Sequence, residues 1–258
     1  MRILYLGDIV GEKTLDVLRD NLDTIKRENR INLVLVNGEN VSGGKGLTQK
    51  HYKILKELGV AGISMGNHTF SKSEIKEYIN DATIVRPANI PCNIGKKVLY
   101  INYNDIKIAL VNMMGRVYQN TPLDDPFKTM DELLKEIKAD YIIVDFHGDA
   151  TSEKQAFFYE FSGKVDAVVG SHTHTQTADE EVYNNTCFIS DMGMCGAYNS
   201  ILGDDIDDVI RRFRTGVFEK LSVSNDSLYK INGVILDLGE KNQITRVNLK
   251  IEGRKWVS

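Results

Sequence analysis

The segment INLVLVNGEN, residues 31–40, contains the pattern that decides the fold. Ile31 to Val36 is an almost wholly apolar run, which is typical of a strand buried on both faces. Gly38, Glu39 and Asn40 follow, so the run ends in a carboxylate and an amide. The segment predicts a buried strand whose carboxyl end presents groups that bind metals or move protons.

The same pattern ends four further apolar runs. These runs end at Gly7-Asp8, Gly66-Asn67-His68, Phe146-His147 and Gly170-Ser171-His172-Thr173-His174. Four of the five histidines therefore lie at strand ends, which random placement would not give. The carboxyl ends of parallel strands line one crevice of an open α/β sheet. If the five strands share a sheet, their polar ends converge there.

The segments between these runs predict helices. Apolar residues recur at helical spacing from Leu15 to Ile25, and Ser71 with Glu74 fits a capping box. Further helices are expected in residues 50–58, 71–80, 130–137, 153–161 and 205–214, a hairpin in 97–111, a surface loop in 113–128, and terminal strands in 234–238 and 247–251. The alternation indicates an α/β fold with a mixed sheet or two packed sheets.

The composition is that of an ordinary globular domain. The chain has 258 residues, 42% of them hydrophobic and 26% charged, with a formal net charge of -4. This mild acidity argues against a general binder of long nucleic acids or membranes. The sequence shows neither a secretory leader nor a transmembrane run, and its three cysteines form no CxxC pair. We expect one reduced, cytoplasmic domain spanning residues 1–258.

The strand ends combine imidazoles with oxygen ligands and contain no thiolate. This donor set suits iron, manganese or zinc better than magnesium or calcium. Glu39 has a carboxylate able to bridge two cations, while Asn40 and Asn67 offer carbonyl oxygens. In an extended segment, His172 and His174 would point the same way about 6.5 Å apart and could reach two adjacent ions. The pattern therefore predicts a metal centre.

These ordered motifs resemble those of the calcineurin-like metallophosphoesterases and, within that superfamily, the YmdB-like bacterial phosphodiesterases. The closer likeness lies in residues 42–48, 65–69, 149–154 and 174–180, and it extends from residue 1 to about residue 250. The resemblance implies a four-layer α/β/β/α sandwich of the metallophosphoesterase type, with mixed sheets. It also implies a dinuclear centre of iron, or alternatively manganese, with zinc less favoured.

The resemblance further implies a role for each residue. The first ion would be bound by Asp8, Glu39, Asn40 and His174, and the second by Glu39, Asn67, His147 and His172. Glu39 would bridge the ions, and His68 would be the proton donor. Such family members hydrolyse small cyclic nucleotides of the 2′,3′-cyclic AMP type to nucleoside monophosphates. In the expected mechanism, a hydroxide shared by two ions attacks phosphorus while His68 protonates the leaving ribose oxygen.

Three positions depart from the wider superfamily. The usual Asp-x-His reads Asp8-Ile9-Val10, Glu39 replaces the bridging aspartate, and Thr69 replaces an acidic residue. The first two departures are shared by the YmdB-like branch. Three alternatives stay open: a phosphomonoesterase with the same centre, an RNA-end nuclease, and a nucleotide-binding regulatory protein with weak turnover. The sequence also leaves open whether the chain forms a homo-oligomer.

Four weaker signals have competing interpretations. The glycine-rich stretch 42–46 is either a flexible turn or a wall of the cleft, and Arg116 either clamps a phosphate or is simply solvated. Cys195 is interpreted as a packing residue rather than a nucleophile. His51, on a predicted helix among lysines, is expected to be exposed.

Overall fold

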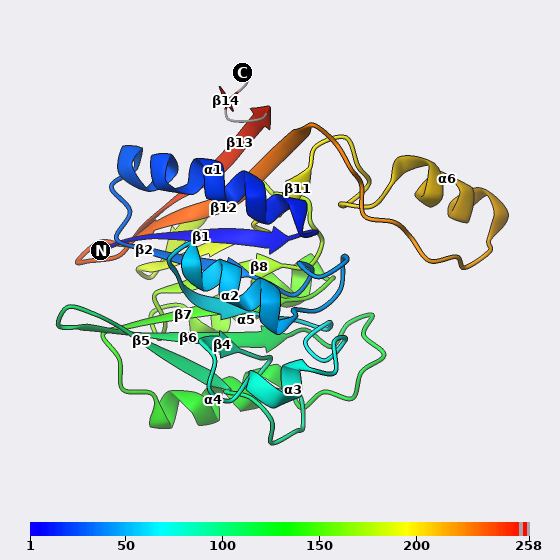
Figure 1. Ribbon diagram of the computed structural model, residues 1–258. Coiled ribbons are helices and arrows are strands. Elements are labelled where there is room, and N and C mark those ends of the chain that lie inside the picture. Colours follow the sequence, from blue (N-terminus) through cyan, green and yellow to red (C-terminus); the bar gives the residue numbers. More distant parts are fainter. Residues whose placement is uncertain (253–254, 257–258) are drawn as a thin grey trace.

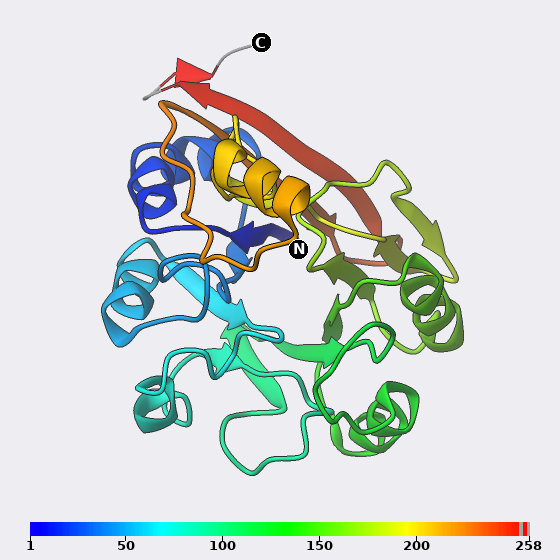
Figure 2. The same cartoon turned by 90° about the vertical axis from the view of Figure 1, so that its right-hand side faces the viewer.

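The computed structural model describes residues 1–252 and 255–256, so residues 253–254 and 257–258 of the expected domain lie outside it. Two β-sheets pack face to face, and helices cover the outer side of each sheet (Figures 1 and 2). The helices α1–α3 lie on one side in Figure 2, and α4 and α5 lie on the other. The four-layer α/β/β/α sandwich with mixed sheets is therefore confirmed.

The first sheet has the strand order β14-β13-β12-β11-β1-β2-β3-β4. Its strands are β1 (Arg2–Ile9), β2 (Leu33–Asn37), β3 (Val60–Ser64), β4 (Ile84–Val85), β11 (Met194–Ala197), β12 (Leu228–Asp237), β13 (Gln243–Glu252) and β14 (Lys255–Trp256). Strands β11, β1, β2, β3 and β4 run parallel, and β12–β14 add an antiparallel edge. The predicted terminal strands are β12 and β13.

The second sheet has the order β5-β6-β7-β8-β10-β9. Its strands are β5 (Val98–Tyr103), β6 (Ile106–Met114), β7 (Tyr141–His147), β8 (Ala167–Ser171), β9 (Glu181–Tyr183) and β10 (Thr186–Ile189). The expected hairpin is confirmed as the antiparallel pair β5–β6. The short strand β9 escaped prediction because its three residues are all exposed and carry no apolar alternation.

Three apolar layers hold the sandwich together. Alternate residues of β1 serve two of them: Leu4 and Leu6 pack under the helices, while Ile3 and Tyr5 pack between the sheets. The third layer lies behind the second sheet, where the phenylalanines of α5 pack. The helices are α1 (Lys13–Glu28), α2 (Gln49–Glu57), α3 (Ile75–Tyr78), α4 (Pro126–Glu136), α5 (Thr151–Phe161) and α6 (Ile206–Thr215).

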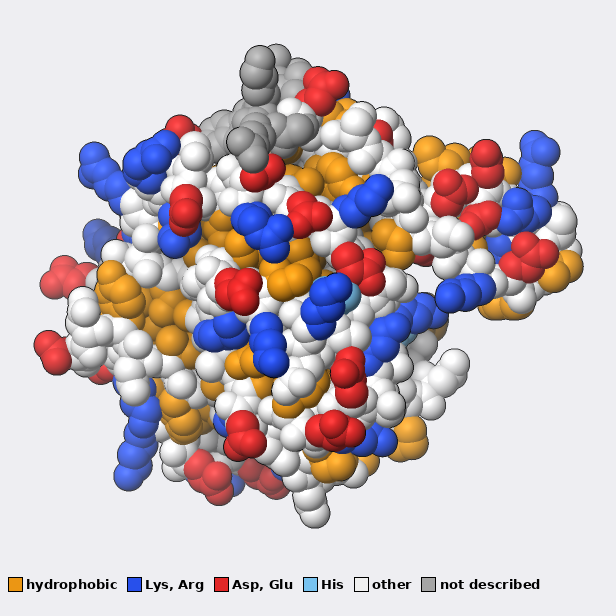
Figure 3. Space-filling view, in the orientation of Figure 1, with side chains coloured by type: hydrophobic (Ala, Val, Ile, Leu, Met, Phe, Trp, Pro, Cys, Tyr) orange, Lys and Arg blue, Asp and Glu red, His pale blue; other side chains and the backbone are white. Residues whose placement is uncertain are grey.

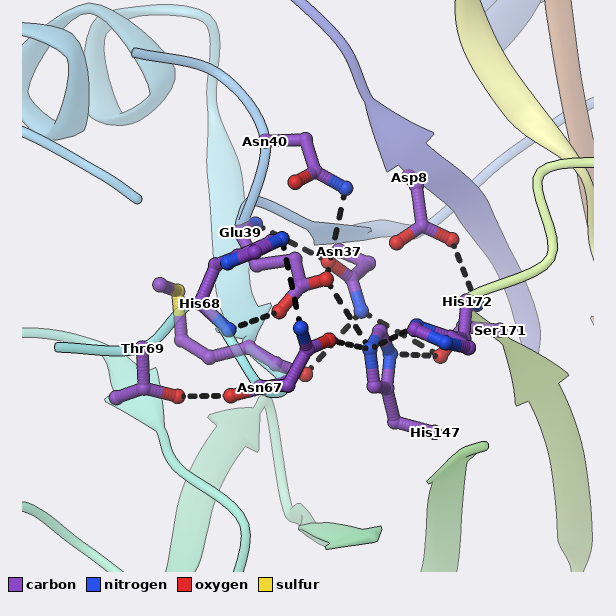
Figure 4. A network of polar contacts seen from close by, with 12 residues as sticks. Asp8, Asn37, Glu39, Asn40, Asn67, His68, Thr69, His147, Ser171 and His172 are labelled. Atoms are coloured by element: carbon purple, nitrogen blue, oxygen red, sulfur yellow. Dashed lines mark hydrogen bonds and ion pairs between the residues drawn. The ribbon is translucent and has the colours of Figure 1, made fainter. Parts of the chain in front are cut away.

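The simplest arrangement, with all five motif-bearing strands in one sheet, is not the one observed. Strands β1, β2 and β3 lie in the first sheet, and β7 and β8 lie in the second. Their carboxyl ends still meet, because the two sheets face each other with these ends at the same edge of the sandwich (Figure 4). The crevice therefore lies between two sheets instead of along one.

Two local predictions were wrong in extent. The helix expected in 71–80 is only the single turn α3, and it has no side-chain cap, because Ser71 contacts the ring of His68 instead of a backbone amide. The loop expected in 113–128 is shorter, because β6 continues to Met114 and Asp125 caps α4. Within the part of the chain that the structure describes, no helix is both long and apolar enough to span a bilayer.

Residues 198–227 leave the sandwich between β11 and β12, and we name this excursion the α6 arm. Its helix projects beside the body of the molecule (Figure 1). Asp205 caps the helix through the amides of Asp207 and Asp208, and Gly216 ends it in the left-handed conformation. Phe213 and Phe218 on the arm are each 84% exposed.

Candidate metal centre

The imidazole of His147, at the end of β7, is the centre of the polar cluster (Figure 4). Three atoms that can offer lone pairs surround its Nε2: Asn67 Oδ1 at 2.9 Å, His172 Nδ1 at 3.0 Å and Glu39 Oε1 at 3.1 Å. His147 itself is fully buried. Such a convergence of lone pairs is the arrangement expected of cation ligands rather than of ordinary hydrogen bonds.

The other ring nitrogen of His147 fixes which tautomer is present. Its Nδ1 lies 2.9 Å from Ser171 Oγ, and that hydroxyl donates to Asp145 Oδ1 at 2.5 Å. Since Ser171 uses its proton on Asp145, its oxygen accepts the Nδ1 proton of His147. The Nε2 lone pair is then free to bind a cation. Hydrogen-bonded support of this kind is typical behind metal-binding histidines.

The same logic orients His172 and His174. Asp149 Oδ1 lies 3.2 Å from His172 Nε2 and accepts its proton, which leaves Nδ1 facing the cluster. The carbonyl of Leu202 lies 2.7 Å from His174 Nδ1, which leaves Nε2 facing Asn40 Nδ2 at 3.0 Å. The two rings therefore present lone pairs to two neighbouring points.

The backbone that carries these rings is not the extended segment that we expected. His172 has a φ of 99° and His174 a φ of 62°, both in the region that disfavours residues with a Cβ. The two histidines face neighbouring points of the cluster through this strained turn and not through i, i+2 alternation. Unusual backbone of this kind is concentrated at functional sites.

Asp8 forms the second side of the cluster. The residue is fully buried, and its Oδ2 accepts the backbone N–H of His172 at 3.2 Å. Its Oδ1 is buried without a hydrogen-bond partner among the described residues, with His174 Nε2 3.8 Å away. A buried carboxylate oxygen with no donor is costly, so this atom is poised for a positive ligand.

The electrostatics of the cluster favour added positive charge. Burial raises the pKa of Asp8 to about 6. Burial alone would also raise the pKa of Glu39, but contact with His147 lowers it to about 2. Burial would lower the pKa of His147, yet Glu39 raises it to about 9. The buried carboxylates are thus stabilised only when a proton or a cation lies beside them.

These residues fit a metal ion on geometric grounds as well. Ligand atoms of Glu39, His147 and His172 all lie within 4.8 Å of one another. A Cβ built on Gly66 would collide with His147 Nε2 and Glu39 Oε2, so only glycine lets β3 end against them. Together with the unpartnered Asp8 oxygen, this donor set is suited to a transition metal.

His68 lies beside the cluster and differs from the other histidines. Its backbone N–H donates to Glu39 Oε2 at 2.9 Å, while its ring is only partly buried and lines a cavity. Ser71 Oγ lies 3.3 Å from its Nδ1, so this hydroxyl orients the ring. Burial lowers the pKa of His68. The cavity has a volume of about 370 Å³ and is also lined by Asn40, His172 and His174.

Sequence reasoning missed the residue that ties the strands together. Asp145, inside the apolar run of β7, accepts hydrogen bonds from Tyr5 on β1, Asn37 on β2, Ser64 on β3 and Ser171 on β8. One fully buried carboxylate therefore joins all five motif-bearing strands, and burial raises its pKa. The available signal was the single acid inside a buried strand, which requires partners.

A second missed pair supports the strained turn. Lys154 Nζ donates to the carbonyl of Ser171 at 2.9 Å and pairs with Asp191 Oδ2 at 3.0 Å. Asp191 Oδ2 also accepts the backbone N–H of Thr173 at 3.0 Å. Both charged groups are almost fully buried. They hold the turn between His172 and His174 from behind.

The structure shows where the residues behind the weaker signals lie. The glycine-rich loop lines the cavity through Gly43, Gly44 and Lys45. Arg116 is half-exposed and pairs with Asp125. Cys195 is buried in the core, as expected.

The expectation for His51 was wrong. Only 9% of the residue is exposed, because its ring turns into the glycine-rich loop instead of toward solvent. Its Nδ1 lies 2.7 Å from Ser42 Oγ and 3.0 Å from Thr48 Oγ1. His51 therefore fixes the start of α2 against the loop that borders the cavity.

Comparisons with known proteins agree with this geometry. A family model described as "YmdB-like protein" matches residues 4–249. The 2′,3′-cyclic-nucleotide 2′-phosphodiesterase of Bacillus subtilis (strain 168) is 40% identical over 257 residues, which are 98% of this chain and 96% of that protein. Among solved structures, a hypothetical protein from Thermus thermophilus has a TM-score of 0.92 at 34% identity, covering 97% of this chain and 99% of that one. A Mycoplasma pneumoniae protein described as a novel phosphatase has a TM-score of 0.89 at 36% identity, with coverages of 96% and 93%.

Proposed function

The chain belongs to the YmdB-like protein family, and on that premise we propose that it is a metal-dependent phosphodiesterase acting on 2′,3′-cyclic nucleotides. Its products would be nucleoside monophosphates. The observation that carries the proposal is the convergence of Asp8, Glu39, His147, His172 and His174 at one edge of the sandwich, with a cavity beside them. The proposal treats residues 1–258 as one metallophosphoesterase domain.

We assign the ligands to two sites on either side of Glu39. Asp8, Glu39, Asn40 and His174 would hold one ion, and Glu39, Asn67, His147 and His172 the other. The contacts in support are those of His147 Nε2 on one side and the free Asp8 oxygen on the other. Rotation of the Asn40 amide by half a turn presents its oxygen, since both orientations of an amide occupy the same space. Iron is the proposed metal, with manganese as the alternative.

Hydrolysis of a 2′,3′-cyclic phosphate adds the oxygen of water to phosphorus and breaks the bond from phosphorus to O2′. When bound, the two cations supply positive charge for the phosphate oxygens and lower the pKa of a water toward about 7. His68 would deliver the proton that the departing O2′ requires, because it is the partly exposed histidine facing the cavity beside Glu39. Ser71 would hold its ring in place.

The test is a substrate panel on protein purified without oxygen and analysed for its metals. The panel contains 2′,3′-cyclic AMP, 3′,5′-cyclic AMP, adenosine 5′-monophosphate and a p-nitrophenyl phosphodiester. We expect the highest kcat/KM on 2′,3′-cyclic AMP, with adenosine 3′-monophosphate as the product.

Two results would replace the proposal. Turnover of monoesters alone would make the protein a phosphomonoesterase. Tight nucleotide binding without turnover, on protein with its full metal content, would make it a regulatory protein. Measuring affinity and turnover on the same preparation separates these two results from each other and from an inactive sample.

A further inference from the structure

The cavity beside the metal centre has two chemically different walls. One wall is the cluster of strand ends with Glu39, His172 and His174, which we name the floor. The facing wall consists of the α6 arm together with the glycine-rich loop, and we name it the roof. Figure 3 shows Lys and Arg side chains along the gap between the body and the projecting arm.

Three cationic side chains of the roof line the cavity: Lys45 from the loop, and Arg212 and Lys220 from the arm. None of these three side chains is hydrogen-bonded or ion-paired with any residue that the structure describes. The guanidinium carbon of Arg212 lies 4.2 Å from the centre of the ring of Phe218, a cation–π contact. The donors of Arg212 therefore have no acceptor among the residues that the structure describes.

Acidic groups of the roof neutralise these cations only in part. Glu219 also lines the cavity, but its carboxylate is bound by Arg211 Nε at 3.2 Å. Asp204 is half-buried at the cavity, and burial raises its pKa. Three cations thus face at most one uncommitted carboxylate. A concave surface with such an excess of unpaired positive charge is suited to an anion.

A cyclic mononucleotide cannot satisfy both walls. Its single phosphate is the group that the floor hydrolyses, so its ribose and base would carry no charge to the roof. The cavity volume of about 370 Å³ is within the range of sites that hold whole small molecules rather than one phosphate. Leu202 and Leu221, beside the cations, offer apolar contact to a nucleoside. A second anionic group on the substrate would give the unpaired roof cations an acceptor.

We propose that the preferred substrate is a nucleoside 2′,3′-cyclic phosphate that carries a further phosphate on O5′, and that Arg212, Lys220 and Lys45 bind this second phosphate. Two molecules share this chemistry: a free 5′-phosphorylated cyclic nucleotide, and the 3′ end of a short RNA that terminates in a cyclic phosphate. The proposal rests on the proposed function for the bond that is broken, but the second phosphate takes no part in the reaction.

The experiment compares three substrates on the metal-loaded full chain. They are 2′,3′-cyclic AMP, its 5′-phosphorylated form, and a dinucleotide that ends in the same cyclic phosphate. We expect kcat/KM to be at least about tenfold higher for one or both of the extended substrates, because charge-assisted contacts to a phosphate are among the stronger hydrogen bonds. A higher kcat/KM for the dinucleotide would identify RNA ends as the substrate class. A higher kcat/KM for 5′-phosphorylated 2′,3′-cyclic AMP would identify the free nucleotide.

The variants are Arg212→Gln and Lys220→Gln, with Arg214→Gln as the matched control. Arg214 is an exposed cation on the same helix, two residues further on and so on nearly the opposite side. The preference is the ratio of kcat/KM for an extended substrate to kcat/KM for 2′,3′-cyclic AMP. We expect the two roof variants to lower this ratio about tenfold, so that it approaches one. The control removes the same charge and should keep the preference. Equal losses on all three substrates, or no preference in the unaltered chain, would overturn the proposal.

A binding measurement keeps this inference separate from the proposed function. We would measure dissociation constants of adenosine 3′,5′-bisphosphate and adenosine 3′-monophosphate by calorimetry on the same metal-loaded protein. Tighter binding of the bisphosphate that is lost in Arg212→Gln supports the second phosphate site even if no cyclic nucleotide is hydrolysed. In that case only the proposed function fails. Equal affinities for the two nucleotides would overturn the site.

Discussion

The floor and the roof of the cavity are built in opposite ways. On the floor, His147, Asp8 and Glu39 are almost fully buried, and every ring nitrogen that faces away from the cluster has a hydrogen-bond acceptor. On the roof, Lys45 and Lys220 are exposed, and the arm that carries α6 projects from the body. The floor is held by buried hydrogen bonds, whereas the arm, which forms most of the roof, projects from the body and is tied to the floor through the carbonyl of Leu202.

This difference separates two tasks of the proposed enzyme. Bond breaking requires ligand atoms held within fractions of an ångström, which buried hydrogen bonds provide. Selecting the substrate requires contacts that can form on binding, and these suit a mobile or exposed segment. Changes to the floor should therefore act on metal content, turnover and stability, while changes to the roof should act on preference among substrates.

The largest effect should follow from Glu39→Gln on the floor. The change keeps the size of the side chain but removes the charge shared by both proposed sites, so metal content should fall below that of the unaltered chain. We expect kcat/KM to fall roughly a thousandfold or more, because positive charge at the phosphate is worth several kcal/mol. Elemental analysis and steady-state kinetics measure the two effects. Glu28→Gln, on an exposed residue of α1, is the control, and full metal content in Glu39→Gln would contradict the bridge.

His68→Ala should lower kcat on 2′,3′-cyclic AMP by about 10²–10⁴-fold while the metal content stays normal. A p-nitrophenyl leaving group needs little protonation, so the same variant should lose far less activity on a p-nitrophenyl phosphodiester. The comparison of the two substrates is the measurement. A loss of the same size on both would show that His68 supports the floor instead of donating a proton.

Lys154→Met tests whether the buried pair behind the floor is needed for folding. The change leaves Asp191 buried without its cation, which should lower the free energy of unfolding by about 3 kcal/mol. Lys164→Met is the matched control, because the pair of Lys164 with Glu160 is exposed and should cost less than about 1 kcal/mol. Urea unfolding of both variants measures the contrast. Equal losses would mean that the Lys154 pair contributes no more than a surface contact.

Ser171→Ala should weaken metal binding about 10–100-fold, because His147 loses the acceptor that fixes its tautomer. The effect should appear in the affinity for the metal, measured by competition with a chelator, and not only in the activity. The control is Ser73→Ala, at an exposed position. An unchanged affinity in Ser171→Ala would show that the ring is oriented by other contacts.

The smallest effect should come from the roof. Phe213→Ser should change the free energy of unfolding by less than about 0.5 kcal/mol, because the ring is 84% exposed. Thermal unfolding at two protein concentrations is the measurement. A shift that grows with concentration in the unaltered chain but not in the variant would instead show that a second chain covers this ring.

Much of the fold could be predicted because its signals are local. The apolar runs of β1, β2 and β7 and the turn between β5 and β6 depend on neighbouring residues only. The positions of the proposed ligand residues could be predicted for the same reason, since each directly follows or ends such a run. A local pattern does not contain which sheet a strand joins, so the sequence left open whether the five strands share one sheet.

The supporting residues could not be predicted in the same way. Asp145 lies inside an apolar strand and Lys154 among the phenylalanines of α5, and their side-chain partners are 26 to 140 residues distant in the sequence. The position of His51 likewise depends on a loop hydroxyl that periodicity does not place. The helix expected in 205–214 is α6, but its projection from the body was not predicted. The metal's identity and the cytoplasmic location stay predictions.

The hydrogen bonds to Asp145 carry a consequence for how such an enzyme can diverge. One carboxylate joins strands from both sheets, so a substitution at any of its four donor residues disturbs the whole metal centre. These four positions are therefore expected to change together or not at all. The arm is inserted between two neighbouring strands and shares none of these bonds. New substrate ranges can therefore arise by changes in the arm, provided that the carbonyl of Leu202 still accepts the hydrogen bond of His174 Nδ1.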